Sequence, residues 1–305
     1  MNNTKYYLAA IIAYATWGFF SLVLKPLAAY PSVDILFYRV FSCAILMLII
    51  VALFKRQAVN ETINTYKALP AYKKRKILLL NVGGSILLTI NWFSFIYVLN
   101  HVSIKAASLA YLVCPILTTL LAWAILRERL SKPQWGAIGL SLASCLLLSY
   151  SNIIDMFYSI IIGLSYAAYL VSQRQNKGFD KFIVLTFHIV LSALILLLFY
   201  PRLGGPVPAE GEFYFYIEII AVAFTIIPLF LNLFALKKLT SSTLGMLLNI
   251  NPIIGFTLAG LLYRERISQV QIIAYSLIFV SVLVFNAHHL FSGKKQQAAL
   301  GSQVN

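Results

Sequence analysis

Arg39 is the residue whose type and position most directly suggest chemistry. It lies about six residues into an apolar run over 33–54, or roughly 9 Å below the start of that run at 1.5 Å per residue. An Arg inside a membrane helix costs about 2.5–3.5 kcal/mol, so it needs a partner or a purpose. A guanidinium binds carboxylates and phosphates well, so Arg39 is predicted to anchor an anionic group. The alternatives are an Arg that snorkels to the surface, or one pinned to a carbonyl or to Asp34.

His188 is the second candidate. It lies about six residues into the apolar run 182–200, at a depth that matches Arg39 on the opposite side of the membrane midplane. A neutral imidazole can hydrogen-bond a solute, and a protonating one can couple its movement to pH. The alternative is a packing residue whose hydrogen bonds are satisfied by neighbouring helices.

Polar and aromatic side chains at membrane depth are the remaining candidates for lining a solute cavity. They are Trp17, Asn91, Trp92, Tyr111, Tyr169, Asn232 and Asn249. As an alternative, the amides form interhelical hydrogen bonds, worth about 0.6 kcal/mol on average in membranes, and the aromatics anchor helix ends. Asn249 could also satisfy the carbonyl that Pro252 leaves free.

The sequence contains no motif for a cofactor, a metal ion or covalent catalysis. It has no phosphate-binding glycine loop, dinucleotide fingerprint, zinc spacing or nucleophile elbow, and its three cysteines fall inside apolar runs. No Asp or Glu lies near the centre of an apolar run. Because ion-coupled carriers commonly use a buried carboxylate, facilitated export, exchange or coupling through His188 is expected instead. No catalytic residue, cofactor or metal is predicted.

The composition excludes a water-soluble globule. Of the 305 residues, 61% are hydrophobic and 11% are charged, against about 25% charged in ordinary soluble domains. Apolar runs long enough to cross the ~30 Å hydrocarbon layer as helices recur along the chain. In this setting the net charge of +15 indicates orientation in the membrane and not nucleic acid binding.

Ten membrane-spanning helices are predicted. Their approximate ranges are 6–24, 33–54, 77–99, 104–126, 134–151, 153–172, 182–200, 214–236, 241–263 and 269–291. With a cytoplasmic N-terminus, the inner segments hold 18 Lys and Arg and the outer segments hold five. Because cytoplasmic loops collect Lys and Arg, this split predicts a multi-pass protein of the cytoplasmic membrane with both termini cytoplasmic.

One stretch of the sequence occurs twice. Residues 115–134 and 252–271 align without a gap, with nine of 20 positions identical, and each copy runs from a proline to Arg-Glu-Arg, a hydrophobic residue and Ser. Five predicted spans fall in each half, so the second half is inverted in the membrane relative to the first. We expect an all-α membrane protein of ten transmembrane helices in two inverted five-helix repeats, 1–151 and 152–292, around a central cavity.

Two segments lie outside the predicted spans. The basic stretch 55–76 is expected to form a short surface helix against anionic headgroups, with a solvated loop as the alternative. Residues 293–305 are polar and are expected to be a disordered cytoplasmic tail.

Several short motifs, together with the plan of two halves, resemble the EamA type of the drug/metabolite transporter superfamily, and within it the RarD-like permeases. The motifs are Tyr14-x-x-Trp17-Gly18, Arg39, Asn91-Trp92, Tyr97-x-x-Asn100, Ser108-Leu109-x-Tyr111-x-x-x-Pro115, Pro228, Ser242-Thr243-Leu244-Gly245 and Pro252. The resemblance covers nearly the whole chain, with one departure at Cys114, where family members often have Asn. It implies a ten-helix bundle that moves small organic solutes by alternating access, without implying which solute.

The expected function is therefore a secondary transporter and not an enzyme. It is expected to export small amphipathic metabolites (amino-acid-like, aromatic or drug-like) across the cytoplasmic membrane. Its partners would be the solute and the lipid bilayer, without nucleic acid, and it is expected to be a monomer or weak homodimer. Two alternatives remain open: a membrane-embedded lipid-modifying enzyme, which needs a convergent acid/base or metal site, and a channel-like facilitator, which needs a continuous polar stripe.

Overall fold

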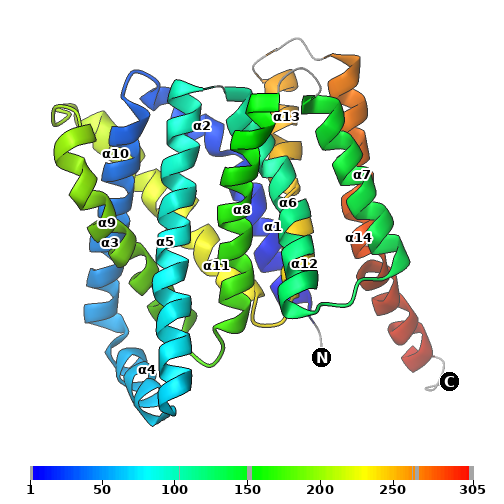
Figure 1. Ribbon diagram of the computed structural model, residues 1–305, viewed down its shortest axis with the longest axis horizontal. Helices are drawn as coiled ribbons and strands as arrows, with labels where there is room; N and C mark the ends of the chain where they lie inside the picture. Colours follow the sequence, from blue (N-terminus) through cyan, green and yellow to red (C-terminus); the bar gives the residue numbers. More distant parts are fainter. Residues whose placement is uncertain (1–2, 103, 150–152, 263, 265–267, 302–305) are drawn as a thin grey trace.

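The protein is a bundle of helices that stand side by side (Figure 1). The computed structural model describes residues 3–102, 104–149, 153–262, 264 and 268–301, and these ranges contain helices and no strand. The elements are α1 (Thr4–Gly18), α2 (Phe20–Leu24), the 3-10 turn Lys25–Leu27, α3 (Ser32–Phe54), α4 (Arg56–Ala68), α5 (Ala71–His101), α6 (Ile104–Leu126), α7 (Lys132–Ser149), α8 (Ile153–Gln175), α9 (Lys181–Leu203), α10 (Gly211–Ala221), the π-helical turn Val222–Ile226, α11 (Ile227–Ala235), α12 (Ser241–Leu247), α13 (Ile250–Leu261) and α14 (Gln269–Gly301).

The prediction of an all-helical, multi-pass membrane protein is confirmed. Within the described ranges, eight helical segments are long and apolar enough to cross a membrane, and the bent pair α1–α2 makes a ninth if it counts as one span. α7, at the predicted span 134–151, is not among them, because it opens with the polar residues Lys132, Pro133 and Gln134.

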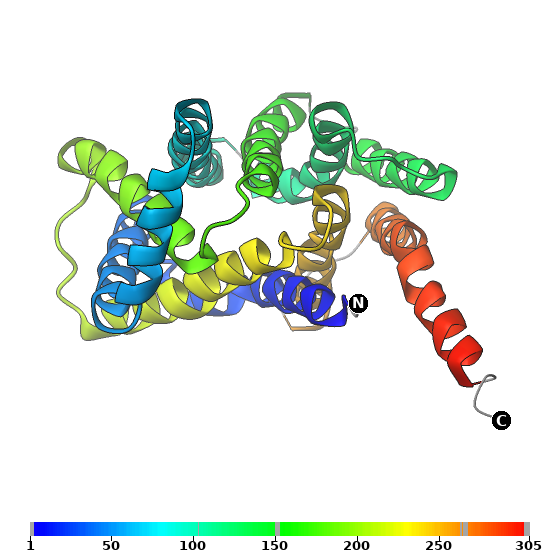
Figure 2. The same ribbon diagram turned by 90° about the horizontal axis from the view of Figure 1, so that it is seen from below.

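The first helix of each half packs mainly on the other half. α1 contacts α11 and α13, and α8 contacts α5 and α6. α3 lies against α9, and α7 lies against α14. Figure 2 shows this interleaving end-on, with the blue α1 beside the yellow α11 segment.

Proline explains one interruption of a span. A proline has no N–H, so it leaves the carbonyl four residues before it without a helical partner. Pro228, at the start of α11, frees the carbonyl of Phe224 in the π-helical turn. The indole N–H of Trp17 donates to that carbonyl at 2.8 Å. A side chain of α1 thus satisfies the backbone of the other half at its irregular turn.

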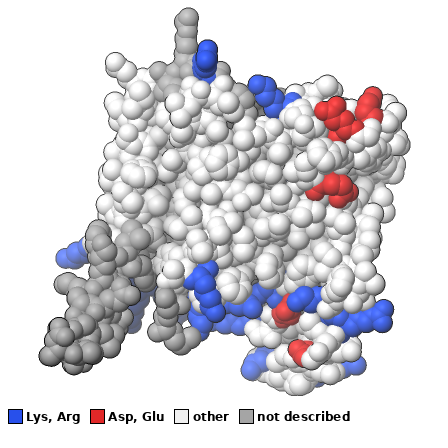
Figure 3. All heavy atoms as spheres, turned by 180° about the vertical axis from the view of Figure 1, so that it is seen from behind, with Lys and Arg blue, Asp and Glu red and all other residues white. Residues whose placement is uncertain are grey.

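The bundle has one strongly basic end. Lys and Arg side chains gather at the end that carries α4, and acidic side chains gather toward the opposite end (Figure 3). The start of α1 and the end of α14 lie at the same basic end (Figure 1). α4 has no buried residue, which confirms the predicted surface helix within 55–76.

The last helix, α14, extends to Gly301 and so includes residues 293–301 of the expected tail, whose disorder and cytoplasmic position stay predictions. The residues there, Lys-Lys-Gln-Gln-Ala-Ala-Leu, are good helix formers, so a helix already nucleated in the span extends through them. Residues 302–305 lie outside the described ranges.

Candidate functional site

Arg39 lies near two aromatic residues, Trp92 and Tyr111, that were also predicted as site residues. Its guanidinium carbon is 5.3 Å from the centre of the Trp92 ring on α5, within the range of a cation–π interaction. Arg39 also lies close enough to Tyr111 on α6 for the two groups to interact electrostatically. The Arg39 Nε atom is buried and has no hydrogen-bond partner among the described residues. Three helices therefore bring a guanidinium and two aromatic rings together inside the bundle.

The proposed pairing of Arg39 with Asp34 is wrong. The Asp34 carboxylate is buried and accepts the backbone N–H of Gly205 at 2.8 Å. It therefore fastens the start of α3 to the loop that follows α9. Among the described residues, no carboxylate forms an ion pair with Arg39.

Trp17 and Asn232 meet at one tyrosine. The Trp17 ring lies edge-on to Tyr166, with the two ring centres 5.9 Å apart, and tilted to Tyr14 at 5.8 Å. Asn232 donates from Nδ2 to the Tyr166 hydroxyl at 3.3 Å. Tyr169 stacks on Tyr166 at 5.8 Å. An aromatic wall from α1 and α8 thus connects two of the predicted site residues.

Several buried polar atoms near this wall lack partners among the described residues. Besides the Arg39 Nε, they include the Tyr14 hydroxyl, the Asn232 Oδ1, and both amide atoms of Asn249. Buried polar atoms are hydrogen-bonded in the great majority of cases, so each of these unpaired atoms is an exception that needs an explanation. The alternative role for Asn249 is wrong, because its side chain makes no hydrogen bond to the backbone near Pro252.

Asn91 forms hydrogen bonds that join α5 to α8. Its Nδ2 donates to the carbonyl of Ile162 at 2.9 Å and to the Ser165 hydroxyl at 3.2 Å, both on α8. Although Asn91 is adjacent in sequence to Trp92, the amide is engaged by α8 while the indole faces Arg39. The interhelical alternative describes Asn91 best.

His188 lies in a polar network that joins the aromatic wall at Tyr169 and extends to Asn81 on α5. Its ring is fully buried, with Nε2 3.2 Å from the Asn81 Oδ1 and Nδ1 3.4 Å from the Tyr169 hydroxyl. The Asn81 Oδ1 also accepts from the Asn176 Nδ2 at 2.9 Å. Asn81 and Trp92 are 11 residues apart on α5, or about 16 Å along its axis. His188 and Arg39 therefore contact α5 at positions about 16 Å apart along its axis.

Glu128, in the first copy of the Arg-Glu-Arg motif, forms hydrogen bonds that join the two halves at the basic end. Arg127 ends α6 in the left-handed conformation at φ 55°, and the Glu128 N–H bonds back to the Ala122 carbonyl at 3.2 Å, as in a Schellman helix end. The Glu128 carboxylate then accepts from the N–H of Ser241 at 2.9 Å, and from the N–H and hydroxyl of Ser242 at 3.0 and 2.6 Å. We call these three hydrogen bonds to the start of α12 the Glu128 latch.

The two parts of the latched span pack very differently. All seven residues of α12 are buried, whereas Pro252 is the one buried residue among the 12 of α13. α12 is the part that the Glu128 latch holds, and α13 continues toward the opposite end of the bundle (Figure 1). The span is therefore buried near the basic end and more exposed beyond its break at Leu248 and Asn249.

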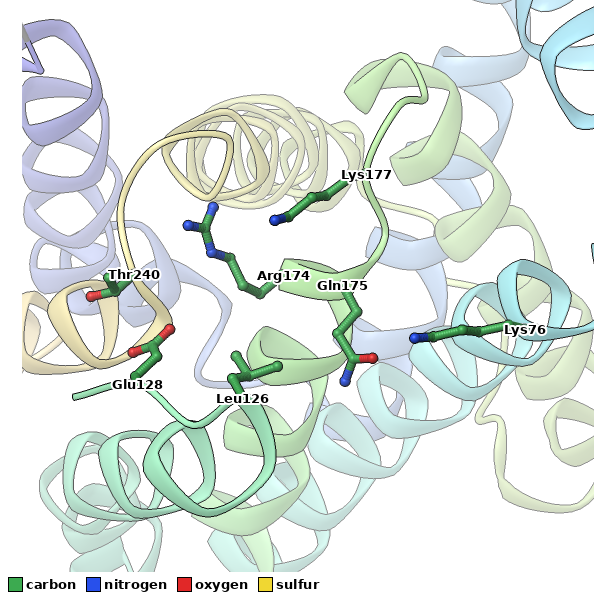
Figure 4. Close-up of a pocket in the computed structure, with 7 residues that line it drawn as sticks. All are labelled: Lys76, Leu126, Glu128, Arg174, Gln175, Lys177 and Thr240. Atoms are coloured by element: carbon green, nitrogen blue, oxygen red, sulfur yellow. The ribbon is translucent and has the colours of Figure 1, made fainter. Parts of the chain in front are cut away.

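A cavity of about 370 Å³ opens beside the latch. Figure 4 shows Arg174 and Lys177 reaching into one space, with Glu128 on its far side and Lys76 entering from α5. Leu126, Gln175 and Thr240 complete its lining. We call this space the basic cavity. No motif in the sequence predicted this cavity, although the repeated Arg-Glu-Arg motif pointed to Glu128.

Two halves of membrane-spanning helices, with spans interrupted by breaks, are a plan found in many secondary transporters. The EamA-like transporter family model matches residues 4–150 and 153–287. The chain therefore belongs to this family, within the drug/metabolite transporter superfamily, and it is a membrane transporter and not an enzyme.

Curated relatives align over nearly the whole chain. The uncharacterized transporter YojE of Bacillus subtilis is 27% identical, with 90% of this chain and 91% of that protein covered. Protein RarD of Streptomyces exfoliatus is 27% identical, with 94% and 90% covered, and protein RarD of Escherichia coli is 23% identical, with 94% and 96% covered. A solved crystal structure shares the fold at a TM-score of 0.71 and 15% identity, covering 93% of this chain and 96% of that one.

Proposed function

We propose that the protein is a secondary transporter that exports small amphipathic metabolites by alternating access between two inverted five-helix repeats. Membership of the EamA-like family supports transport, and the two matched segments, 4–150 and 153–287, support a boundary near residue 151. Because carriers with inverted repeats expose one site to either side in turn, this plan needs no energy-coupling domain.

The contacts between helices support the inverted arrangement. In the ten-span plan, α1 is the first span of its half and α8 is the first span of the other, and each packs on the third and fourth spans of the opposite half. Both copies of the Arg-Glu-Arg motif begin with an Arg in the left-handed conformation, Arg127 at φ 55° and Arg264 at φ 52°. In this plan α7 counts as the fifth span.

The basic end is proposed to face the cytoplasm, in the cytoplasmic membrane. Lys and Arg gather there (Figure 3), as they do on the inner side of membrane proteins. Both the start of α1 and the end of α14 lie at this end, so both termini would be cytoplasmic (Figure 1). The Glu128 latch then closes the inner side, and the more exposed α13 lies toward the outside.

The solute is proposed to bind at Arg39 and Trp92. The observation that carries this proposal is the half-buried Arg39 side chain, whose Nε is buried without a hydrogen-bond partner and whose guanidinium lies against Trp92 and within electrostatic reach of Tyr111, with no carboxylate paired to it among the described residues. An anionic group on the solute would pair with the guanidinium, and an apolar or aromatic body would pack on the rings. Trp17, Asn232 and Asn249 extend this surface, and Tyr169 supports it through Tyr166.

A ligand screen on purified protein tests this site. Amino acids, aromatic acids, nucleobases and phosphorylated metabolites are added one at a time, and the shift in unfolding temperature is measured. Arg39→Ala is run beside Arg75→Ala, which removes the same charge from an exposed position at the start of α5. A shift that disappears in Arg39→Ala and persists in Arg75→Ala supports the site. A shift that persists in both removes Arg39 as the anchor.

A further inference from the structure

The three cations of the basic cavity outnumber its one carboxylate. Lys76, Arg174 and Lys177 line it together with a single acid, Glu128. The Glu128 oxygens are occupied by the start of α12. No salt bridge joins these cations to an acid within the described residues. The cavity therefore presents a local excess of positive charge.

The other nearby acid is also occupied. Asp180 lies three residues after Lys177, and its Oδ1 accepts the N–H groups of Phe182 and Ile183 at 2.8 and 3.1 Å. It thus caps the start of α9, which is the ordinary use of Asp at that position. Since both acids are bound to helix ends, an anion from outside the protein is the natural counterion for the cavity.

The cations approach from three directions. Lys76 comes from α5, Arg174 from the last turn of α8, and Lys177 from the connection between α8 and α9 (Figure 4). The Arg174 Nη1 donates to the Leu236 carbonyl at the end of α11, which holds this side chain in place. A tetrahedral phosphate offers oxygens in several directions and suits such an arrangement better than a planar carboxylate does.

The size and position of the cavity suit a small phosphate compound. Its volume of about 370 Å³ is near the lower end of the range of about 300–1,000 Å³ for small-molecule sites. It lies where α6 and α8 end, at Leu126 and Gln175, and both residues are also the last residues of candidate membrane spans. A phosphate could therefore come from a soluble metabolite or from the headgroup of an anionic lipid.

We propose that the basic cavity is a binding site for a phosphate group, held by Lys76, Arg174 and Lys177. Its place in transport, as the point where an anionic solute first docks on the inner side, rests on the proposed function. The binding site itself does not, because it is formed at the surface of the latched structure.

Saturable binding of radiolabelled inorganic phosphate to purified, delipidated protein tests the site. The double variant Lys76→Gln/Lys177→Gln removes two exposed cavity cations and leaves Arg174 in place. Its control is Lys67→Gln/Lys73→Gln, which removes two exposed cations from the same end outside the cavity. We expect the cavity variant to bind on the order of tenfold more weakly and the control to bind like the unmodified protein.

Lipid nanodiscs separate the two sources of phosphate. Loss of phosphate binding in discs of phosphatidylglycerol, but not in discs of phosphatidylcholine, assigns the site to an anionic headgroup. Binding that persists in both assigns it to a soluble phosphate compound. Absence of saturable binding to the unmodified protein, or equal weakening in both double variants, overturns the proposal. A failed transport assay leaves this result intact, because binding is measured without flux.

Discussion

Replacing Glu128 with Ala is expected to raise the population of a state that is open at the basic end. The substitution removes three hydrogen bonds to α12. Hydrogen bonds to a charged group contribute about 1.5–3 kcal/mol each, but these three share one carboxylate beside an open cavity, where water replaces part of the loss. We take about 2–3 kcal/mol for the whole latch. At 1.4 kcal/mol per factor of ten, the ratio of open to closed protein rises roughly 30- to 140-fold.

Cys114 provides the reporter. It lies near the middle of α6, is 2% exposed, and reacts with a thiol reagent only when an opening reaches it. With Cys43 and Cys145 changed to Ala, an impermeant thiol reagent is applied to inside-out vesicles, so that it enters from the proposed cytoplasmic side. If labelling follows the open population, its rate in Glu128→Ala rises by the same factor as that population.

Two further variants make the experiment decisive. Glu61→Ala also removes an acid from the basic end, but that carboxylate accepts a bond from Gln57 on the surface helix α4 and does not contact α12, so no change is expected. Glu128→Gln keeps one acceptor oxygen, and an intermediate rate is expected. If folded Glu128→Ala labels no faster than the unmodified protein, the latch does not hold the basic end closed and the reasoning is refuted.

Three other variants test the packing. Gly245→Ala places a Cβ 2.7 Å from the Thr118 Cβ, whereas a Cβ at Gly255 meets nothing within 4 Å. We expect Gly245→Ala to lower the free energy of unfolding by about 1–3 kcal/mol and Gly255→Ala to change it by no more than about 1 kcal/mol, as measured by chemical unfolding. Equal effects of the two substitutions would contradict the close contact at Gly245. Trp17→Phe leaves the Phe224 carbonyl without its indole N–H donor, so the free energy of unfolding should fall by about 1–3 kcal/mol in the same assay. An unchanged free energy of unfolding would mean that this hydrogen bond contributes nothing to stability. His188→Ala should lower the free energy of unfolding by a similar amount, because it removes two buried hydrogen bonds. It should leave the pH profile of transport unaltered, because both ring nitrogens face neutral partners. A flattened pH profile would show that His188 is the proton-coupling group.

The sequence predicted most of the spanning helices but not which side chains contact one another across helices. Apolar length predicted nearly every spanning helix, and the surface helix α4 followed from its polarity. The repeated motif singled out Glu128 but did not reveal that it binds Ser241 and Ser242, over 110 residues away. Arg39 and Trp92 were both predicted as site residues, and the structure brings them together. Asn91 and His188 were predicted with them, and both form hydrogen bonds to neighbouring helices, a possibility that the sequence also allowed.

What the sequence determined by itself is the membrane class, the approximate spans, the charge asymmetry and the repeat. These follow from composition along the chain, because hydropathy decides whether a segment enters the bilayer and Lys and Arg decide its orientation. Only the tertiary structure decided which faces point inward and which residues from distant helices meet. Lipid tails are as apolar as a protein interior, so spanning helices are apolar on most sides and carry no hydrophobic stripe that marks the buried face. The pairing of Trp17 with Phe224, of Glu128 with α12 and of His188 with Asn81 is therefore set by helix packing alone.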